Sequence, residues 1–145
     1  MSDLSKRIIS VFLYTFPLQS SIPFGDNLFL QFPYLNLINL LTLPIELLES
    51  LLPFGKLLLF LTIFLGLVRN TNIPYFIRYN ACQVILLNIT LIISTYAINL
   101  TKFYELSILI FLISLIVIIY AVIQCILGVE PEIPFISQSA RLQIY

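Results

Sequence analysis

The sequence contains no histidine and no tryptophan, and it has only 7 basic and 7 acidic residues among 145. Without histidine, the chain lacks the commonest metal ligand and the side chain that most often moves protons near neutral pH. A formal net charge of zero provides no basic surface for nucleic acid. The sequence therefore indicates no metal or other cofactor and excludes nucleic acid as a partner.

Cysteine is also scarce, and the familiar catalytic motifs are missing. Cys82 and Cys125 lie far apart in apolar segments and do not form a CxxC or zinc pattern. We interpret them as unpaired packing residues. The chain has no Walker loop, HExxH or GxSxG motif, and no serine or threonine has an obvious general base. The sequence does not predict an enzyme.

Apolar residues dominate what is present. They make up 60% of the chain and charged residues 10%, against about 45–50% and about 25% in soluble domains. We therefore expect an all-α polytopic membrane protein whose single membrane domain covers residues 1–145. Four apolar segments predict transmembrane helices: residues 8–24, 54–68, 76–98 and 106–127.

The first of these segments is short for a bilayer and contains Pro17, so we expect a kinked helix. The segment that follows, residues 28–52, is interrupted by Pro33 and Pro44 and contains no clean span of twenty apolar residues. We expect an interfacial or re-entrant helical segment there, and a spanning arrangement stays open. Glu46 and Glu49 are three residues apart and are expected to turn one helical face to water.

The segment 76–98 is the most polar of the four. On a helical wheel, Asn80, Gln83 and Asn88 fall on one half together with Thr90, Ser94 and Thr95. That half must face protein or water, because an unpartnered amide in hydrocarbon is costly. The other half is expected to face lipid and comprises Cys82, Ile85, Leu86, Ile89 and Ile93.

The polar half has two interpretations, an interhelical hydrogen-bond network or a hydrated path, and the sequence leaves both open. Segments 76–98 and 106–127 are expected to run antiparallel, which brings Gln83 and Gln124 to similar depth. We therefore predict a polar layer near the face that carries the termini. Its members are Arg78, Asn80, Gln83, Gln124 and Glu130, and Asn88 belongs to the same candidate path.

Small residues recur every seven positions along the fourth segment, at Ser107, Ser114, Ala121 and Gly128. Seven residues are two helical turns, so the four line up along one edge and predict a helix-packing seam. The tail, residues 129–145, contains two prolines and is expected to be short and ordered or bound at the surface.

The basic residues predict the orientation of the four segments. Five lie on the side that holds both termini, namely Lys6, Arg7, Arg69, Arg78 and Arg141, and two lie on the other side, Lys56 and Lys102. This bias places both termini on the cytoplasmic or equivalent side.

Several motifs carry a family resemblance. The run from Val68 through Asn70, the run from Phe76 through Asn88, and Pro53-Phe54-Gly55 resemble the signature of the family named for the twenty-kilodalton Tic subunit. Tic is the protein translocon of the chloroplast inner envelope. The resemblance covers nearly the whole chain, including the tail motif around Ile133-Pro134. Four positions depart from the family pattern: Tyr75, Tyr79, Cys82 and Asn88.

The resemblance implies four membrane helices and a part in moving precursor proteins across the inner envelope, with a contribution to the conducting path left open. It implies other Tic subunits, precursors in transit and the lipid membrane as partners. The expected location is the plastid inner envelope membrane with both termini in the stroma, as a plastid-encoded short member. The alternative location is a bacterial plasma membrane.

Two alternative functions remain compatible with the residues alone. One is a small-solute or amino-acid channel or carrier that acts by itself, although such proteins usually place charges or broken helices at the midplane. The other is a structural scaffold that holds the subunits of a membrane complex together.

Overall fold

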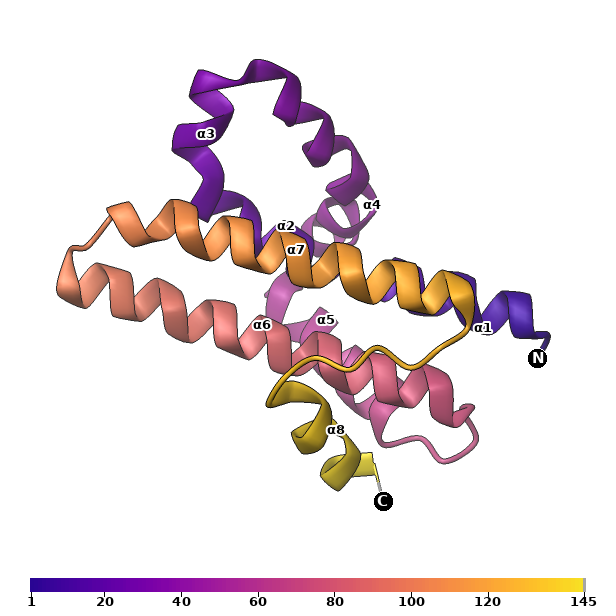
Figure 1. Ribbon diagram of the computed structural model, residues 1–145. Coiled ribbons are helices and arrows are strands. Elements are labelled where there is room, and N and C mark those ends of the chain that lie inside the picture. The colour runs from indigo at the N-terminus through magenta and orange to yellow at the C-terminus, as the bar shows by residue number, and fades with distance from the viewer. Residues whose placement is uncertain (145) are drawn as a thin grey trace.

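The computed structural model describes residues 1–144, and within that range it contains helices and connecting loops but no β-strand (Figure 1). Three helical segments are long and apolar enough to cross a bilayer: Asp3–Gln31, α6 (Tyr75–Thr101) and α7 (Glu105–Leu127). A bent pair, Pro33–Leu51 and Gly55–Val68, adds a fourth if it is counted as one span. The predicted all-α polytopic membrane class is confirmed, with three to four candidate spans.

The first span is a chain of short helices. They are α1 (Asp3–Leu13), α2 (Thr15–Ser21), the 3-10 turn η1 (Ile22–Gly25) and α3 (Asp26–Gln31). Pro17 has no N–H to donate to the carbonyl of Leu13, four residues earlier, and the helix is interrupted at Tyr14. The interruption agrees with the kink expected from Pro17.

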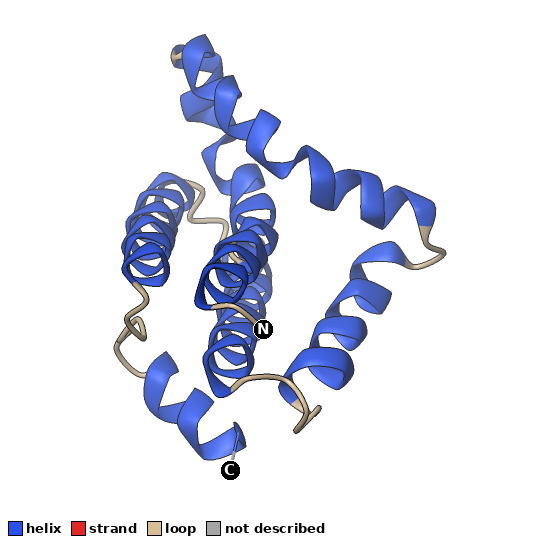
Figure 2. Ribbon diagram, turned by 90° about the vertical axis from the view of Figure 1, so that its right-hand side faces the viewer, coloured by secondary structure: helices blue, strands red, loops and turns tan. Residues whose placement is uncertain are grey.

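The next part of the chain projects beside the bundle. It comprises η2 (Pro33–Asn36), α4 (Leu37–Leu51), α5 (Gly55–Ile63) and the π-helical turn η3 (Phe64–Val68). Figure 2 looks along α6 and α7 and shows α4 running across them. The chain bends by 106° between Pro33–Leu51 and Gly55–Val68. Residues 55–68 extend only about 21 Å, against roughly 30 Å for the bilayer core, so the segment 54–68 reaches spanning length only together with α4.

The two glutamates of α4 do not share a water-facing surface. Glu49 Oε2 accepts a hydrogen bond from Gln19 Nε2 of α2 at 2.9 Å, whereas Glu46 Oε1 accepts one from Thr42 Oγ1 at 3.0 Å. Both glutamates are partly buried. The expectation of a common face turned to water is wrong for Glu49, because α4 packs against α2.

The first half of α6 is enclosed on all sides. Cys82 is 1% exposed and Ile85 is 4% exposed, so the expectation that they face lipid is wrong. Contacts from α1, α2, η3 and α8 surround this part of the helix. Further along, Ile93 is 62% exposed and Thr90 is exposed as well, with its hydroxyl bonded to the carbonyl of Leu86 in its own helix. Burial along α6 therefore depends on how many neighbours surround it at each depth, not on one polar half.

The far end of the bundle has its own apolar cluster. Phe29 of α3 meets Phe111 of α7 edge to face, with ring centroids 5.5 Å apart. Leu91 and Ile98 of α6 and Phe24 of η1 complete the cluster. This packing fixes α3 and η1 against the α6–α7 hairpin.

The tail forms a helix that returns to the bundle. After α7, an extended stretch leads into α8 (Ile136–Ile144), which packs against α6 (Figure 1). Ser137, Ala140 and Ile144 are its buried residues, at the spacing of one helical face. The tail is thus part of the core at the end where the chain begins.

Candidate functional site

The polar residues of α6 meet a tyrosine from the first span inside the bundle. The Tyr14 hydroxyl lies 3.0 Å from Asn80 Oδ1 and 2.8 Å from Gln83 Oε1. Tyr14 is 1% exposed and both amides are 0% exposed. Tyr14 stands at the break between α1 and α2, where a buried phenol needs an acceptor. The contact therefore ties the broken first span to α6.

The same glutamine also holds the tail. Gln83 Nε2 donates to the carbonyl of Pro131 at 2.8 Å and to Ser137 Oγ at 2.8 Å. A carbonyl only accepts, which fixes the orientation of the amide. Ser137 Oγ in turn accepts the backbone N–H of Ile133 at 2.6 Å, and Tyr79 donates to the Pro131 carbonyl at 3.0 Å. Gln83 thus links α6 to the break at Tyr14 and to the start of α8.

Asn80 brings α7 into the network. Its Nδ2 donates to the carbonyl of Phe76 at 2.8 Å, and Cys125 of α7 donates its thiol to Asn80 Oδ1 at 3.2 Å. Cys82 points elsewhere, with Sγ 3.7 Å from Gln143 Oε1 of α8. Both cysteines are free and buried.

Arg78 lies beside the amides and makes a separate set of contacts. Its Nε donates to the carbonyl of Val68 at 3.1 Å and its Nη2 to the carbonyl of Ile144 at 2.9 Å. These carbonyls end η3 and α8, where no further helical turn supplies a donor. A guanidinium has several donors in a fixed plane and can hold both at once. Arg78 therefore fastens two helix ends to α6.

Two of the predicted polar residues stand outside this network. Asn88 is 1% exposed, yet neither of its side-chain polar atoms has a hydrogen-bond partner among the described residues. Gln124 is partly buried, and its side chain makes no hydrogen bond within residues 1–144. The structure brings Asn80 and Gln83 together and leaves Asn88 and Gln124 apart.

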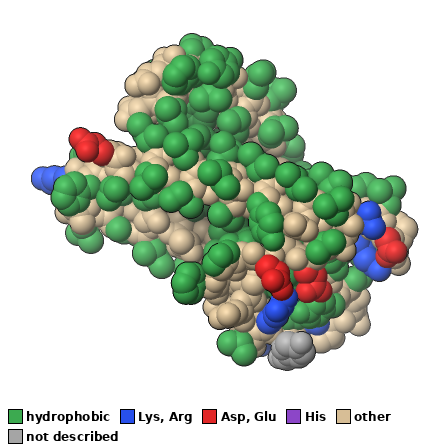
Figure 3. Space-filling view, in the orientation of Figure 1, with side chains coloured by type: hydrophobic (Ala, Val, Ile, Leu, Met, Phe, Trp, Pro, Cys, Tyr) green, Lys and Arg blue, Asp and Glu red, His purple; other side chains and the backbone are tan. Residues whose placement is uncertain are grey.

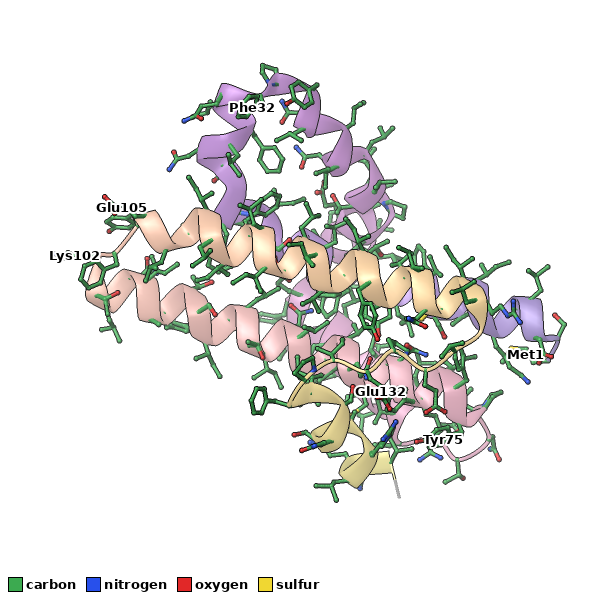
Figure 4. The ribbon with its side chains drawn as sticks, viewed as in Figure 1. Met1, Phe32, Tyr75, Lys102, Glu105 and Glu132 are labelled. Atoms are coloured by element: carbon green, nitrogen blue, oxygen red, sulfur yellow. The ribbon has the colours of Figure 1, made fainter. Side chains whose placement is uncertain are left out.

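Glu130 does not join Arg78 as predicted. It lies 3.9 Å from Arg141, which forms a closer pair with Glu132 at 2.9 Å. The hydrogen bond to Glu132 is the main reason why the pKa of the Arg141 guanidinium is raised. Arg141 also lies over the ring of Tyr79, 5.7 Å from its centroid. These charges are therefore paired between α8 and the stretch that precedes it, where Glu132 is labelled in Figure 4.

The small residues of α7 lie toward the first span at both ends of the helix. Ser107 Oγ donates to the carbonyl of Phe24 in η1 at 2.9 Å. Ser114 is buried but bonds within α7, and Ala121 is 0% exposed in the core. Gly128 ends α7 with φ +78°, against the guanidinium of Arg7. The four positions support the proposal of a packing seam between α7 and the broken first span.

Sequence reasoning missed most partners of the two amides. Tyr14, Pro131 and Ser137 were not predicted as partners, although each supplies a hydroxyl or carbonyl. A tyrosine inside an apolar run is one signal that could have found Tyr14, since its hydroxyl must be satisfied when buried. Pro131 acts through its backbone carbonyl, which no side-chain pattern predicts.

The hydrogen-bond network around Asn80 and Gln83 carries no charge and is buried in the protein. The network consists of amides, hydroxyls, a thiol and backbone carbonyls, with no carboxylate or amine among its members. Within residues 1–144, no three His, Cys, Asp or Glu side chains are placed to hold a metal ion. Such a set of groups can hold helices in register.

Comparison with known proteins identifies the family. The family model described as chloroplast import apparatus Tic20-like matches residues 4–140. The chain belongs to the Tic20-like family. A Tic20 family protein of Synechocystis sp. is 34% identical, with 99% of this chain and 95% of that protein covered. The family resemblance noted in the sequence is thereby confirmed.

Two plant proteins are also similar. Protein TIC 20-II, chloroplastic, of Arabidopsis thaliana is 28% identical over 97% of this chain and 73% of that protein. Protein TIC 20-v, chloroplastic, of the same plant is 30% identical over 98% of this chain and 72% of that protein. Tic20 relatives thus occur in a cyanobacterium and in chloroplasts, and the matched region contains the whole buried network.

Proposed function

We propose that this chain is a membrane subunit of the protein translocon of the plastid inner envelope and takes part in the import of precursor proteins. The observation that carries the proposal is the match to the Tic20-like import family over residues 4–140. The long apolar helices support a place in the membrane. The proposed partners are other Tic subunits and precursors in transit.

The distribution of charge supports the proposed orientation. Arg7 lies at the end of α7, and Arg78 and Arg141 lie where α6 starts and α8 packs. Lys102 lies at the opposite end of the α6–α7 hairpin (Figures 1 and 4). By the positive-inside rule, the end with more arginines faces the stroma. In a cyanobacterial cell, as the Synechocystis relative suggests, the corresponding places are the plasma membrane and the cytoplasm.

The geometry favours a non-enzymatic role for the polar face of α6. Asn80 and Gln83 are fully buried, and their hydrogen-bonding atoms are occupied by protein groups. A hydrated path would need polar atoms left open to water. We therefore interpret this layer as an interhelical network that keeps the terminus-bearing end of the bundle rigid, which weighs against a solute channel at this depth.

The test is purification of the tagged protein from its native membrane in a mild detergent, followed by mass spectrometry of the proteins that accompany it. Co-purification of Tic subunits or of an arrested precursor is the expected result. Recovery of the chain alone, as a homo-oligomer with solute flux in proteoliposomes, would contradict the proposal in favour of an independent channel.

A second experiment separates a conducting subunit from a scaffold. An apolar groove of about 350 Å³ runs between α6 and α7, and Ile113, which lines it, is 53% exposed. A photoreactive amino acid at position 113 reports what passes there during import. Crosslinks to an arrested precursor support a place on the conducting path, whereas crosslinks only to other subunits support a scaffold.

A further inference from the structure

Arg7 occupies the corner between the first helix and the end of α7. Its Nη1 donates to the carbonyl of Ile126 at 3.1 Å, one of the last carbonyls of that helix. A Cβ atom on Gly128 would lie 2.7 Å from Arg7 Nη2, so glycine is the residue that lets the guanidinium lie against the helix end. The side chain is thus held in a fixed place at the terminus-bearing surface.

Arg7 forms no ion pair in the described part of the chain, although Asp3 lines the same polar hollow and its pKa is lowered mainly by Lys6 and to a smaller extent by Arg7. Asp3, the nearest acid on the same helix, is paired with Lys6 at 2.9 Å. Glu130 and Glu132 are paired with Arg141. Arg7 makes a single bond to a neutral carbonyl, which leaves most of its five N–H donors available.

Two hollows of different character meet at Arg7. A polar hollow of about 230 Å³ is lined by Asp3, Lys6, Phe76 and Gly128 as well as Arg7. An apolar hollow of about 460 Å³ runs along α1 and the end of α7 and is also lined by Arg7.

The apolar hollow has an exposed wall. Leu4, Ile8 and Phe12 follow one another at the helical spacing of four, and they are 68%, 60% and 41% exposed. Ile126 faces them from α7 and is 57% exposed. Figure 3 shows charged side chains at this end of the molecule with hydrophobic side chains beside them. A charged corner and an apolar channel therefore adjoin.

We propose that this corner binds one anionic phospholipid, with its phosphate on Arg7 and an acyl chain along Leu4, Ile8, Phe12 and Ile126. Arginine forms two parallel hydrogen bonds with a phosphate, which suits an unpaired guanidinium held in place. The site lies at the end of the bundle that carries the excess of basic residues, where the membrane surface attracts them. The inference depends on the membrane location and stands independently of any role in import.

The experiment is native mass spectrometry of the purified protein with dioleoyl phosphatidylglycerol, using phosphatidylcholine of the same chains as the neutral lipid. Wild-type protein is expected to retain one phosphatidylglycerol. Arg7→Gln is expected to bind it about tenfold more weakly, as for loss of one charged hydrogen-bond partner. The matched control is Arg69→Gln, an exposed arginine on the same side, which should bind like wild type.

Two further measurements keep the test decisive. Ile8→Ser alters the apolar wall without touching Arg7, and it should weaken retention even if Arg7→Gln does not fold. Soluble glycerophosphoglycerol, which has the head group without acyl chains, should not displace the lipid at equal concentration. Equal retention of both lipids, equal affinity of Arg7→Gln and wild type, or no effect of Ile8→Ser would overturn the proposal. A protein that co-purifies in place of the lipid, crosslinked through position 8, would overturn it as well.

Discussion

The Tyr14 hydroxyl lies 2.8 Å from Gln83 Oε1, and this contact joins two residues that are 69 positions apart in the chain. Asn80 Oδ1 lies 3.0 Å from the same hydroxyl and also accepts the Cys125 thiol. The first span, α6 and α7 therefore meet at one buried point.

Tyr14→Phe removes the hydroxyl that lies within hydrogen-bond distance of both amide oxygens. The variant keeps the ring in its buried place and leaves Gln83 Oε1 without a donor, so we expect a loss of about 1 kcal/mol, in the range for hydrogen bonds in membrane proteins. The melting temperature in detergent should fall by a few degrees. Tyr96→Phe is the matched control, because Tyr96 is 67% exposed. Equal melting temperatures for both variants would contradict the role assigned to Tyr14.

Gln83→Leu should release the tail. The leucine cannot donate to the Pro131 carbonyl or to Ser137 Oγ, and both groups are left buried without that partner. We expect α8 to detach more often and trypsin to cleave faster after Arg141. Gln124→Leu is the control, because Gln124 sits on the facing helix without a side-chain hydrogen bond in the described chain. If both variants are cleaved at the wild-type rate, Gln83 does not hold the tail.

Arg78→Lys tests whether the guanidinium fork is needed or only the charge. A lysine ammonium on a flexible stem does not reproduce the planar arrangement that reaches the carbonyls of Val68 and Ile144 together. We expect α8 amide protons to exchange several-fold faster with deuterium, while those of α7 stay protected. Unchanged exchange in α8 would show that one charged contact suffices.

Two glycines offer a matched pair of substitutions. Gly128 has φ +78°, and a Cβ there would lie 2.7 Å from Arg7 Nη2, so Gly128→Ala combines backbone strain with displacement of that side chain. We expect a loss of about 1–2 kcal/mol. Gly66→Ala adds a Cβ that meets no atom within 4 Å and should be neutral or slightly stabilising. Melting temperatures of the two variants in one detergent provide the comparison, and a neutral Gly128→Ala would contradict it.

Much of the architecture follows from the sequence because lipid imposes strict rules on composition. The apolar runs at 76–98 and 106–127 lie inside α6 and α7, since only a helix satisfies backbone groups in hydrocarbon. The helical-wheel prediction that Cys82 and Ile85 of α6 face lipid is wrong. A hydropathy pattern assumes one lipid face, whereas α6 is central at that depth, and its neighbours come from both ends of the chain.

The contacts of the site were less predictable than its members. Asn80 and Gln83 stood out because amides are rare in an apolar helix. Their partners depend on the break at Tyr14 and on the return of the tail, which brings the Pro131 carbonyl and Ser137 to α6. Tyr79 is a further example, because its hydroxyl donates to that same carbonyl. Such long-range packing is not encoded in any local spacing.

Asn88 offers the sharpest distinction between a structural and a conducting role for α6. It is 1% exposed, and neither polar atom has a partner in the described structure. A buried unsatisfied amide costs about 1–3 kcal/mol, so Asn88→Leu should keep or raise the melting temperature if nothing else uses that amide. Asn80→Leu is the control and should lower it, because it removes the acceptor of Tyr14 and Cys125.

Import of a labelled precursor into membranes containing each variant completes the comparison for Asn88. Suppose that Asn88→Leu is at least as stable as wild type but supports precursor import several-fold more slowly. The Asn88 amide then contacts the precursor as it passes α6. Import at the wild-type rate would instead show that the polar positions of α6 act only in packing. The two outcomes cannot be confused with misfolding, because stability and protein level are measured on the same membranes.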